Sequence, residues 1–239
     1  MAGTITGANL LLRIEDTLQD PSNVRWTEAE LLRYINDGQR EIVNIRPEAT
    51  STSANIALAV GTAQSIPSAA LRLLKVVRNV SAAGSSATGG RTIRLVEQDI
   101  LDTQEPSWHD PTVTGDAAHS TIVKHYIFDE DDPRRYYVYP GASSTSTFIE
   151  IVYSDAPSDL ANTSATLDVD DIYANAVVDY ALYRAFMKDA ENAGNQQRAQ
   201  AHFSLFNTSI GNGAQISNSS SPNLDPIRNA PPPVGVQVG

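Results

Sequence analysis

The densest group of side chains with chemical potential is an acidic run of four residues, Asp129, Glu130, Asp131 and Asp132. Clustered carboxylates are hard oxygen ligands of the kind that Ca²⁺ prefers. The run lacks the spacing of an EF-hand loop, however, and it leads directly into Pro133 and two arginines. Acidic residues followed by proline are typical of turns. We therefore interpret the run as a solvated hairpin turn, in which the acids face Arg134 and Arg135, rather than as a metal site.

Other residue types that support catalysis are present without the spacing that catalysis needs. No two histidines have the separation that puts a zinc-binding pair on one helix face. No Gly-x-Ser-x-Gly elbow of a hydrolase occurs, and the glycines at 84, 89 and 90 do not form a phosphate-binding loop. We therefore expect no catalytic residue, no metal and no cofactor. The histidines, which we interpret as isolated structural or surface residues, are His109, His119, His125 and His202.

Three tyrosines lie close together after the acidic turn, at positions 136, 137 and 139. Aromatic rings suit either a sugar-stacking face or a protein interface. Successive side chains of a strand point to opposite faces, so Tyr137 and Tyr139 should lie on the same side. At least one of the two faces is then expected to belong to a core.

The excess of acidic over basic residues limits which classes of partner the protein can bind. The chain has 239 residues, with 28 acidic against 17 basic residues and a formal net charge of -11. Gripping a phosphate backbone needs clustered lysine and arginine, so direct nucleic-acid binding is disfavoured. No apolar stretch is long enough for a membrane span, and the first residues do not resemble a signal peptide. The absence of cysteine excludes disulfides and thiolate chemistry. We expect a protein that stays in the cytosol where it is made.

Two helices are predicted in the first 47 residues. The first covers residues 8–19, with apolar residues at spacings of three and four and a stop at Asp20-Pro21. The second begins at a capping box of Thr27 as N-cap and Glu30 at the third helical position. Trp26, just before the cap, is expected to pack on Leu31 as a hydrophobic staple. This helix should end at Arg46-Pro47.

Residues 48–165 differ in character, because serine, threonine and glycine loops separate short β-branched and aromatic runs. They predict an inserted antiparallel β domain. Its expected strands cover residues 71–80, 91–96, 121–128, 135–139 and 148–153.

Two further helices are predicted after the β domain. Asp168 is the expected N-cap of the third, with Asp171 at its third position. Its buried stripe is expected to consist of Ile172, Ala176, Tyr180, Tyr183 and Met187. The fourth helix, after a break near residues 192–194, should bury Ala199, Phe203, Phe206 and Ile210.

The expected architecture is α+β. Residues 1–47 and 166–210, from the two ends of the chain, should form a four-helix bundle around the β insertion. Residues 211–239 are rich in Asn, Ser and Pro and are expected to be a flexible arm. The end of that arm, residues 234–238, alternates and has no charge, so it could add as a strand or lie in a groove supplied by a partner.

The order of these elements resembles a known family. The relevant pieces are the Trp26-Thr27 helix start with Leu31–Asp37, the hairpin of residues 129–140 and 148–153, and the helix of residues 173–193 with its Lys188–Asn192 ending. Each piece is common, but their order and separation together resemble the tail-adaptor proteins of tailed bacteriophages. The likeness covers most of the chain except the loops and the arm.

This resemblance implies a structural protein without catalytic residues. It implies a dodecameric ring at the head–tail interface of the virion, bound to the portal protein on one side and to a tail or nozzle protein on the other. Genomic DNA would pass through the ring without specific binding. The acidic balance fits a lumen that repels DNA, and it fits solubility before assembly equally well. The arm residues expected to bind the portal are Leu224, Ile227, Val234, Val236 and Val238.

A second hypothesis comes from a different class. The β domain could be a peripheral module of the virion that binds a receptor or carbohydrate, with the helices as its anchor. Binding to a glycan array, together with absence from tail-less heads, would favour this hypothesis.

Overall fold

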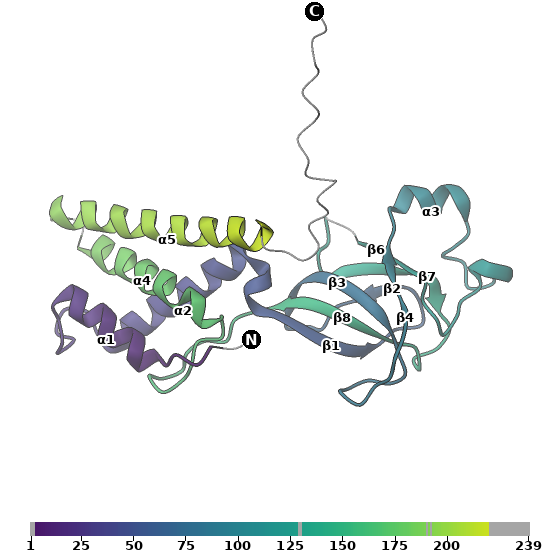
Figure 1. Cartoon of the computed structure of the whole chain (residues 1–239), viewed down its shortest axis with the longest axis horizontal. Helices are drawn as coiled ribbons and strands as arrows, with labels where there is room; N and C mark the ends of the chain where they lie inside the picture. The colour runs from purple at the N-terminus through teal and green to yellow at the C-terminus, as the bar shows by residue number, and fades with distance from the viewer. Residues whose placement is uncertain (1–2, 129–130, 190, 192, 220–239) are drawn as a thin grey trace, which may run out of the picture.

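The computed structural model describes residues 3–128, 131–189, 191 and 193–219. The longer helices gather at one end of the molecule, and the strands and one short helix, residues 98–104, lie at the other (Figure 1). The α+β class predicted from the sequence is therefore confirmed. The two ends have separate hydrophobic cores, one among the helices and one between the sheets.

Helix α1 (Gly7–Leu18) agrees closely with the predicted first helix. The Thr6 side chain caps it by accepting from the backbone N–H of Asn9, and Gln19 ends it with a φ of 57°. Its apolar stripe faces the helical core, because leucine and isoleucine recur every three or four residues.

Helix α2 (Glu28–Ile45) begins at the predicted N-cap, where Thr27 Oγ1 accepts from the backbone N–H of Glu30 at 3.3 Å. Trp26 and Leu31 are both buried in the helical core. The carboxylate of Glu30 accepts from Tyr34 and from Lys188 of another helix, at 2.8 and 2.7 Å. Glu30 therefore joins two helices in addition to its place in the first turn.

Helix α4 (Ala174–Lys188) starts later than predicted, after a 3₁₀ turn, η3 (Asp171–Tyr173). The predicted cap at Asp168 is wrong, because Asp170 accepts from the N–H of Ile172 whereas Asp168 accepts from Ser158. Ala176 and Tyr180 are buried as predicted, but Ile172 and Met187 are 76% and 45% exposed.

Helix α5 (Ala193–Ser219) buries Ala199, Phe206 and Ile210, whereas Phe203 is 40% exposed. The helix continues beyond residue 210, where the prediction ended it. Glycines at 211 and 213 are weak helix formers, and they led to the early stop.

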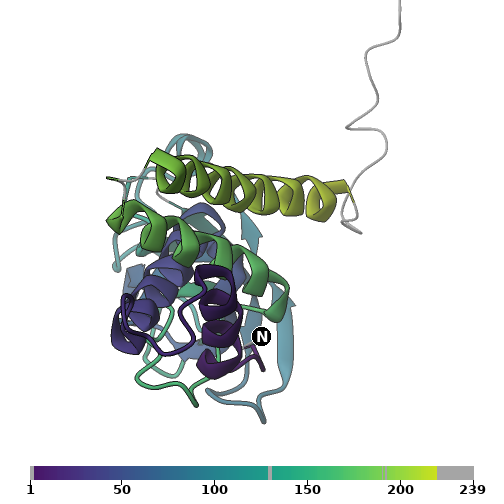
Figure 2. The same cartoon turned by 90° about the vertical axis from the view of Figure 1, so that its left-hand side faces the viewer.

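Helix α4 is central among the helices, because it contacts α1, α2 and α5 (Figures 1 and 2). The beginning of the chain also pairs with a distant segment. Gly3 N–H donates to the carbonyl of Leu167, the N–H of Leu167 donates to that of Ile5, and Thr6 forms a β-bridge with Thr166. The start of the chain is thus tied to the segment that leads into α4. Within the described residues, no helix has the length and apolar character needed to cross a membrane.

The first sheet has the order β1-β8-β3-β4, and all its neighbours are antiparallel. Its strands are β1 (Ser51–Ala57), β3 (Ala70–Val80), β4 (Gly89–Thr92) and β8 (Phe148–Asp155). A 3₁₀ turn, η1 (Pro47–Thr50), connects α2 to β1. The prediction missed β1, because its serines and threonines are typical of a loop.

The second sheet has the order β2-β7-β6-β5. Its strands are β2 (Gly61–Ser65), β5 (Arg94–Leu95), β6 (His125–Phe128) and β7 (Arg135–Ala142). The pair β5–β6 is parallel, so the expectation of a purely antiparallel domain is wrong there. The predicted strand over 91–96 is divided between the two sheets, and the one over 121–128 is a strand only from residue 125.

Side chains fill both faces of β7. Tyr136 and Val138 lie in the core between the sheets, which also contains Val76, Ile149 and Ile151. Tyr137 and Tyr139 point to the other face, toward Trp108 and the short helix α3 (Gln98–Gln104). The predicted common side of Tyr137 and Tyr139 is therefore confirmed. A last 3₁₀ turn, η2 (Gly115–Ala117), lies beside the same strand.

Candidate functional site

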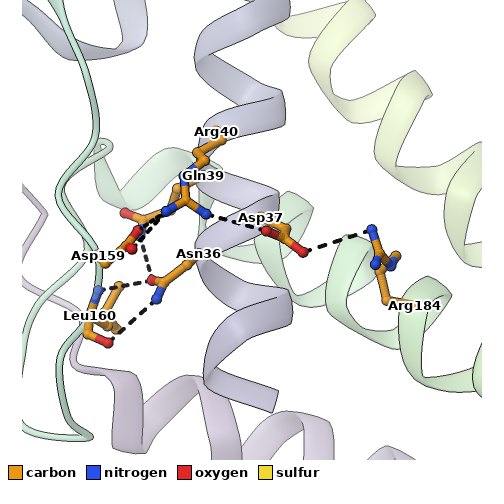
Figure 3. A network of polar contacts seen from close by, with 7 residues as sticks. All are labelled: Asn36, Asp37, Gln39, Arg40, Asp159, Leu160 and Arg184. Carbon is orange, nitrogen blue, oxygen red and sulfur yellow. Dashed lines mark hydrogen bonds and ion pairs between the residues drawn. The ribbon is translucent and has the colours of Figure 1, made fainter. Parts of the chain in front are cut away.

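A polar groove of about 320 Å³ lies where α2, α4 and the segment around Asp159 meet. Figure 3 shows most of its side chains, which come from both helices and from that segment. The groove combines basic, acidic and aromatic groups. Its lining residues are Arg33, Tyr34, Asn36, Asp37, Arg40, Asp159 and Arg184.

Ion pairs cross the groove in a chain (Figure 3). Arg40 pairs with Asp159 at 2.7 Å and with Asp37 at 3.3 Å, and the other oxygen of Asp37 lies 3.8 Å from Arg184. The arginine side chains are 51% and 41% exposed, so each pair contributes only about 0.2–1 kcal/mol. The pairs orient the guanidinium groups more than they stabilise the fold.

Buried amides beneath the groove hold the 156–168 segment against α2. The Asn36 side chain accepts from the N–H of Leu160 at 2.9 Å and donates to its carbonyl at 3.4 Å. Gln39, which is 1% exposed, accepts from the N–H of Asp168 at 2.8 Å. Buried backbone groups need such partners, since an unpaired one costs about 1–3 kcal/mol. These two amides therefore position Asp159 at the edge of the groove.

Tyr34 supplies the aromatic side of the groove. The Arg184 guanidinium lies 5.5 Å from the centre of its ring, a cation–π contact. Its hydroxyl donates to Glu30, and burial together with this hydrogen bond raises the pKa of Tyr34 to about 12. Lys188 in turn keeps the pKa of Glu30 below its usual value. The ring thus stays neutral beside a fixed set of charges.

The arginine side chains of the groove are suited to binding a carboxylate group. Three arginines against two aspartates leave one net positive charge in the groove, although the whole chain carries -11. Arg33 is exposed and forms no ion pair within 4 Å among the residues that the structure describes, although its charge helps to lower the pKa of Glu30. The described residues also contain no group of three or more His, Asp or Glu side chains placed to hold a metal ion.

The helix-start residues expected from the sequence lie next to this groove. Trp26 donates its indole N–H to the carbonyl of Ala185 on α4 at 3.1 Å, and Leu31 is fully buried. Thr27 and Glu30 lie at the start of the same helix. The five predicted arm residues, Leu224, Ile227, Val234, Val236 and Val238, lie outside the described residues, as do Asp129 and Glu130 of the acidic run.

Sequence reasoning missed the groove itself. One local feature could have indicated it: the apolar stripe of α2 is interrupted by four polar residues, Asn36, Asp37, Gln39 and Arg40. Arg184 and Asp159 had no local signal, because only the tertiary fold brings them to α2.

The remaining aromatic and histidine candidates are mostly internal. Tyr136 is fully buried and Tyr139 is 7% exposed, so these two rings do not form an exposed stacking face. Burial raises the pKa of Tyr136. His109 stacks on Trp108, and His202 lies 2.9 Å from Asp179.

Comparison with known proteins decides the family. The model of the SU10 adaptor protein family matches residues 5–226. The chain belongs to the SU10 adaptor protein family. The match spans the helical end, both sheets and α5, so it covers every described element. No curated protein matches the chain.

Membership in the SU10 adaptor family confirms the resemblance to phage tail adaptors noted from the sequence. It indicates a structural role as a phage adaptor, in a family that is not a class of enzymes. An adaptor of this kind is a virion component that interacts with portal and tail proteins.

Proposed function

We propose that this protein is a head-to-tail adaptor that forms a ring beneath the portal and joins the DNA-filled head to the tail. The observation that carries the proposal is the family match over residues 5–226. In this role the helices of residues 1–47 and 166–210 act as one bundle, and residues 48–165 act as an inserted domain. The shared core of α1, α2, α4 and α5 supports that division.

The arm is proposed to order on the portal. Since α5 includes residues 211–219, which the sequence had assigned to the arm, the proposed arm is shortened to residues 220–239. About 20 residues can span roughly 70 Å when extended, enough to reach along a neighbouring subunit. Its contacts would come from Leu224, Ile227, Val234, Val236 and Val238, of which the last three alternate with small or polar residues at the end of the chain.

The ring is proposed to surround the exit path of the genome. A net charge of -11 disfavours adhesion of DNA to the wall, because like charges repel within a Debye length of about 8–10 Å. DNA would then pass without specific binding.

Native mass spectrometry of the protein with portal rings tests this function. We expect one portal ring to gain many copies of the chain. A variant that ends at Ser219 should stay folded, by circular dichroism, and lose attachment to the portal. Full attachment of that variant would exclude the arm as the anchor, and no binding by the intact chain would contradict the adaptor function.

A second candidate function rests on a polar pocket of about 400 Å³ on the first sheet. Its lining includes Ser53, Asn55, Arg78, Ser85 and Glu150, and Arg78 pairs with Glu150 at 2.6 Å. The planar polar groups of Asn55, Arg78 and Glu150 suit sugar hydroxyls, which favours a carbohydrate-binding β domain. A glycan array with the intact chain and with Asn55→Ala would test this. If neither the intact chain nor Asn55→Ala bound any glycan on the array, the carbohydrate-binding function would be excluded.

A further inference from the structure

A second polar pocket, of about 300 Å³, lies where the end of α1, the last turn of α4 and the first part of α5 meet. It shares no residue with the groove. Its lining contains an arginine and a histidine but no acidic residue, although the whole chain carries -11. The lining residues are Thr17, Leu18 and Gln19 of α1, Phe186 of α4, and Arg198 and His202 of α5.

The ring of Phe186 positions both basic side chains of the pocket. Phe186 is 4% exposed and belongs to the helical core, so its own ring is held in place. The His202 ring stacks on it, with 5.7 Å between the ring centres and 13° between the planes. The Arg198 guanidinium lies 5.7 Å from the centre of the same ring, a cation–π contact. Both basic groups are therefore oriented before a ligand arrives.

Three side chains of the pocket have N–H groups that are not used within the fold. Nδ1 of His202 lies 2.9 Å from the carboxylate of Asp179, which can only accept, so Nδ1 is the donor. This leaves Nε2 for a ligand, and Nε2 carries a proton when the imidazole is charged. Among the residues that the structure describes, Arg198 forms no ion pair and the side-chain amide of Gln19 forms no hydrogen bond.

These donors match one carboxylate better than a row of phosphates. A carboxylate accepts up to about four hydrogen bonds, and it pairs with the planar fork of an arginine. A nucleic acid would bring further negative charge close to the acids that adjoin the α1 residues of the pocket in sequence, which are Glu15, Asp16 and Asp20. In the groove, by contrast, Arg40 and Arg184 already face aspartates.

We infer that this pocket binds the carboxylate of one glutamate or aspartate side chain on a partner protein, with Arg198, His202 and Gln19 as the donors. The inference rests on the proposed adaptor function for the source of the carboxylate, because an adaptor of this family interacts with portal and tail proteins. The donors themselves all belong to this chain, so the site can be tested without the partner.

NMR titration of the intact chain with a short peptide that has blocked ends and a single glutamate tests the site. The titration is done at about pH 5.5, where an ordinary histidine is mostly charged and a glutamate is mostly ionised. We expect saturable shifts of the signals of Arg198, His202 and Gln19, and no such shifts with the glutamine analogue of the peptide. Equal shifts with both peptides, or none with the glutamate peptide, would overturn the site. Inorganic phosphate that bound as tightly as the glutamate peptide would overturn its preference for a carboxylate.

Substitution of Arg198 tests the main donor. Arg198→Gln should weaken binding of the glutamate peptide about ten- to a hundredfold, the loss expected for a hydrogen bond between charged groups. Arg198→Lys keeps the charge without the planar fork and should weaken binding less. Arg94→Gln, which changes an exposed arginine on β5 in the same way, is the matched control and should bind like the intact chain. Equal affinities of Arg198→Gln and Arg94→Gln would overturn the site.

The native mass spectrometry described above separates this site from the proposed function. Attachment of the intact chain to portal rings, without saturable binding of the glutamate peptide, would overturn the site and leave the adaptor function standing. Binding of the peptide without attachment to portal rings would support the site and contradict the adaptor function.

Discussion

The indole N–H of Trp26 donates to the backbone carbonyl of Ala185, 3.1 Å away in the interior. This bond joins the residue before the N-cap of α2 to the last turn of α4, across 159 residues of sequence. It places the groove residues of both helices in a fixed relation.

Replacing Trp26 with Phe should keep an aromatic ring in the core and leave the carbonyl of Ala185 without this donor. We expect a loss of about 1–3 kcal/mol in the free energy of unfolding, measured by urea denaturation. Arg25→Ala, which removes a neighbouring side chain that is 56% exposed, is the control and should cost less than about 1 kcal/mol. Equal losses in both variants would contradict a specific role for the indole.

Replacing Asn36 with Ala should destabilise the segment that carries Asp159. The N–H and carbonyl of Leu160 would both lose their side-chain partner, at a cost of about 1–3 kcal/mol. Faster amide hydrogen exchange of Leu160 would locate the effect. Asp159→Ala removes only an exposed ion pair and should leave that exchange unchanged. Unchanged exchange in Asn36→Ala would refute the positioning role.

Stability should fall on acidification through Asp171. Its carboxylate accepts from the Thr4 hydroxyl and from the N–H groups of Thr4 and Ile5, and these bonds lower the pKa of Asp171 below its usual value. A carboxyl whose pKa is lowered by folding stabilises the fold above its unfolded value, and this contribution is lost as the pH falls through the folded value.

We therefore expect Asp171→Asn to be less stable than the parent chain near neutral pH and to converge with it below about pH 4. Urea midpoints measured across this range give the comparison. Thr4→Ala should show a weaker form of the same behaviour, because it removes only one donor. Parallel curves for all three proteins would show that the N-terminal contact does not depend on this charge.

Two phenylalanines on α5 should respond differently to truncation. Phe206 is fully buried against α4, whereas Phe203 is 40% exposed. Phe206→Ala should cost about 3–5 kcal/mol in thermal or urea unfolding. Phe203→Ala lies on the same helix and should cost much less. Similar losses would mean that α5 does not pack on α4 through Phe206.

Patterns that are local in sequence predicted their elements well. Thr27 and the apolar spacing of α1 and α2 are recognised within a few residues, and the structure has both helices at those places. Strands β7 and β8, which carry Tyr136 and Ile149, also follow from their β-branched and aromatic runs. The predicted hairpin between them is wrong, however, because β7 lies in the second sheet and β8 in the first.

Elements that depend on tertiary partners were not predictable. Strand β1, with Ser51 and Thr52, becomes a strand because β8 pairs with every one of its residues. The groove depends on Asp159 and Arg184 meeting α2, although both are far from it in sequence. The start of α4 was misplaced because Asp168 and Asp170 are equally good caps by residue type, whereas in the fold Asp168 bonds to the distant residues Ser158 and Gln39.

The two connections between the helices and the sheets lie side by side. Ser51 at the start of β1 is opposite Ser154 near the end of β8, and the Thr50 hydroxyl donates to the carbonyl of Asp155 at 2.7 Å. Tension between the two ends of the molecule would therefore enter β1 and β8 together, along their length. Since β8 also pairs with β3, such a load shears many hydrogen bonds at once instead of unzipping them singly. Strands β1 and β8 together therefore form a mechanically stiff connection between the helices and the sheets.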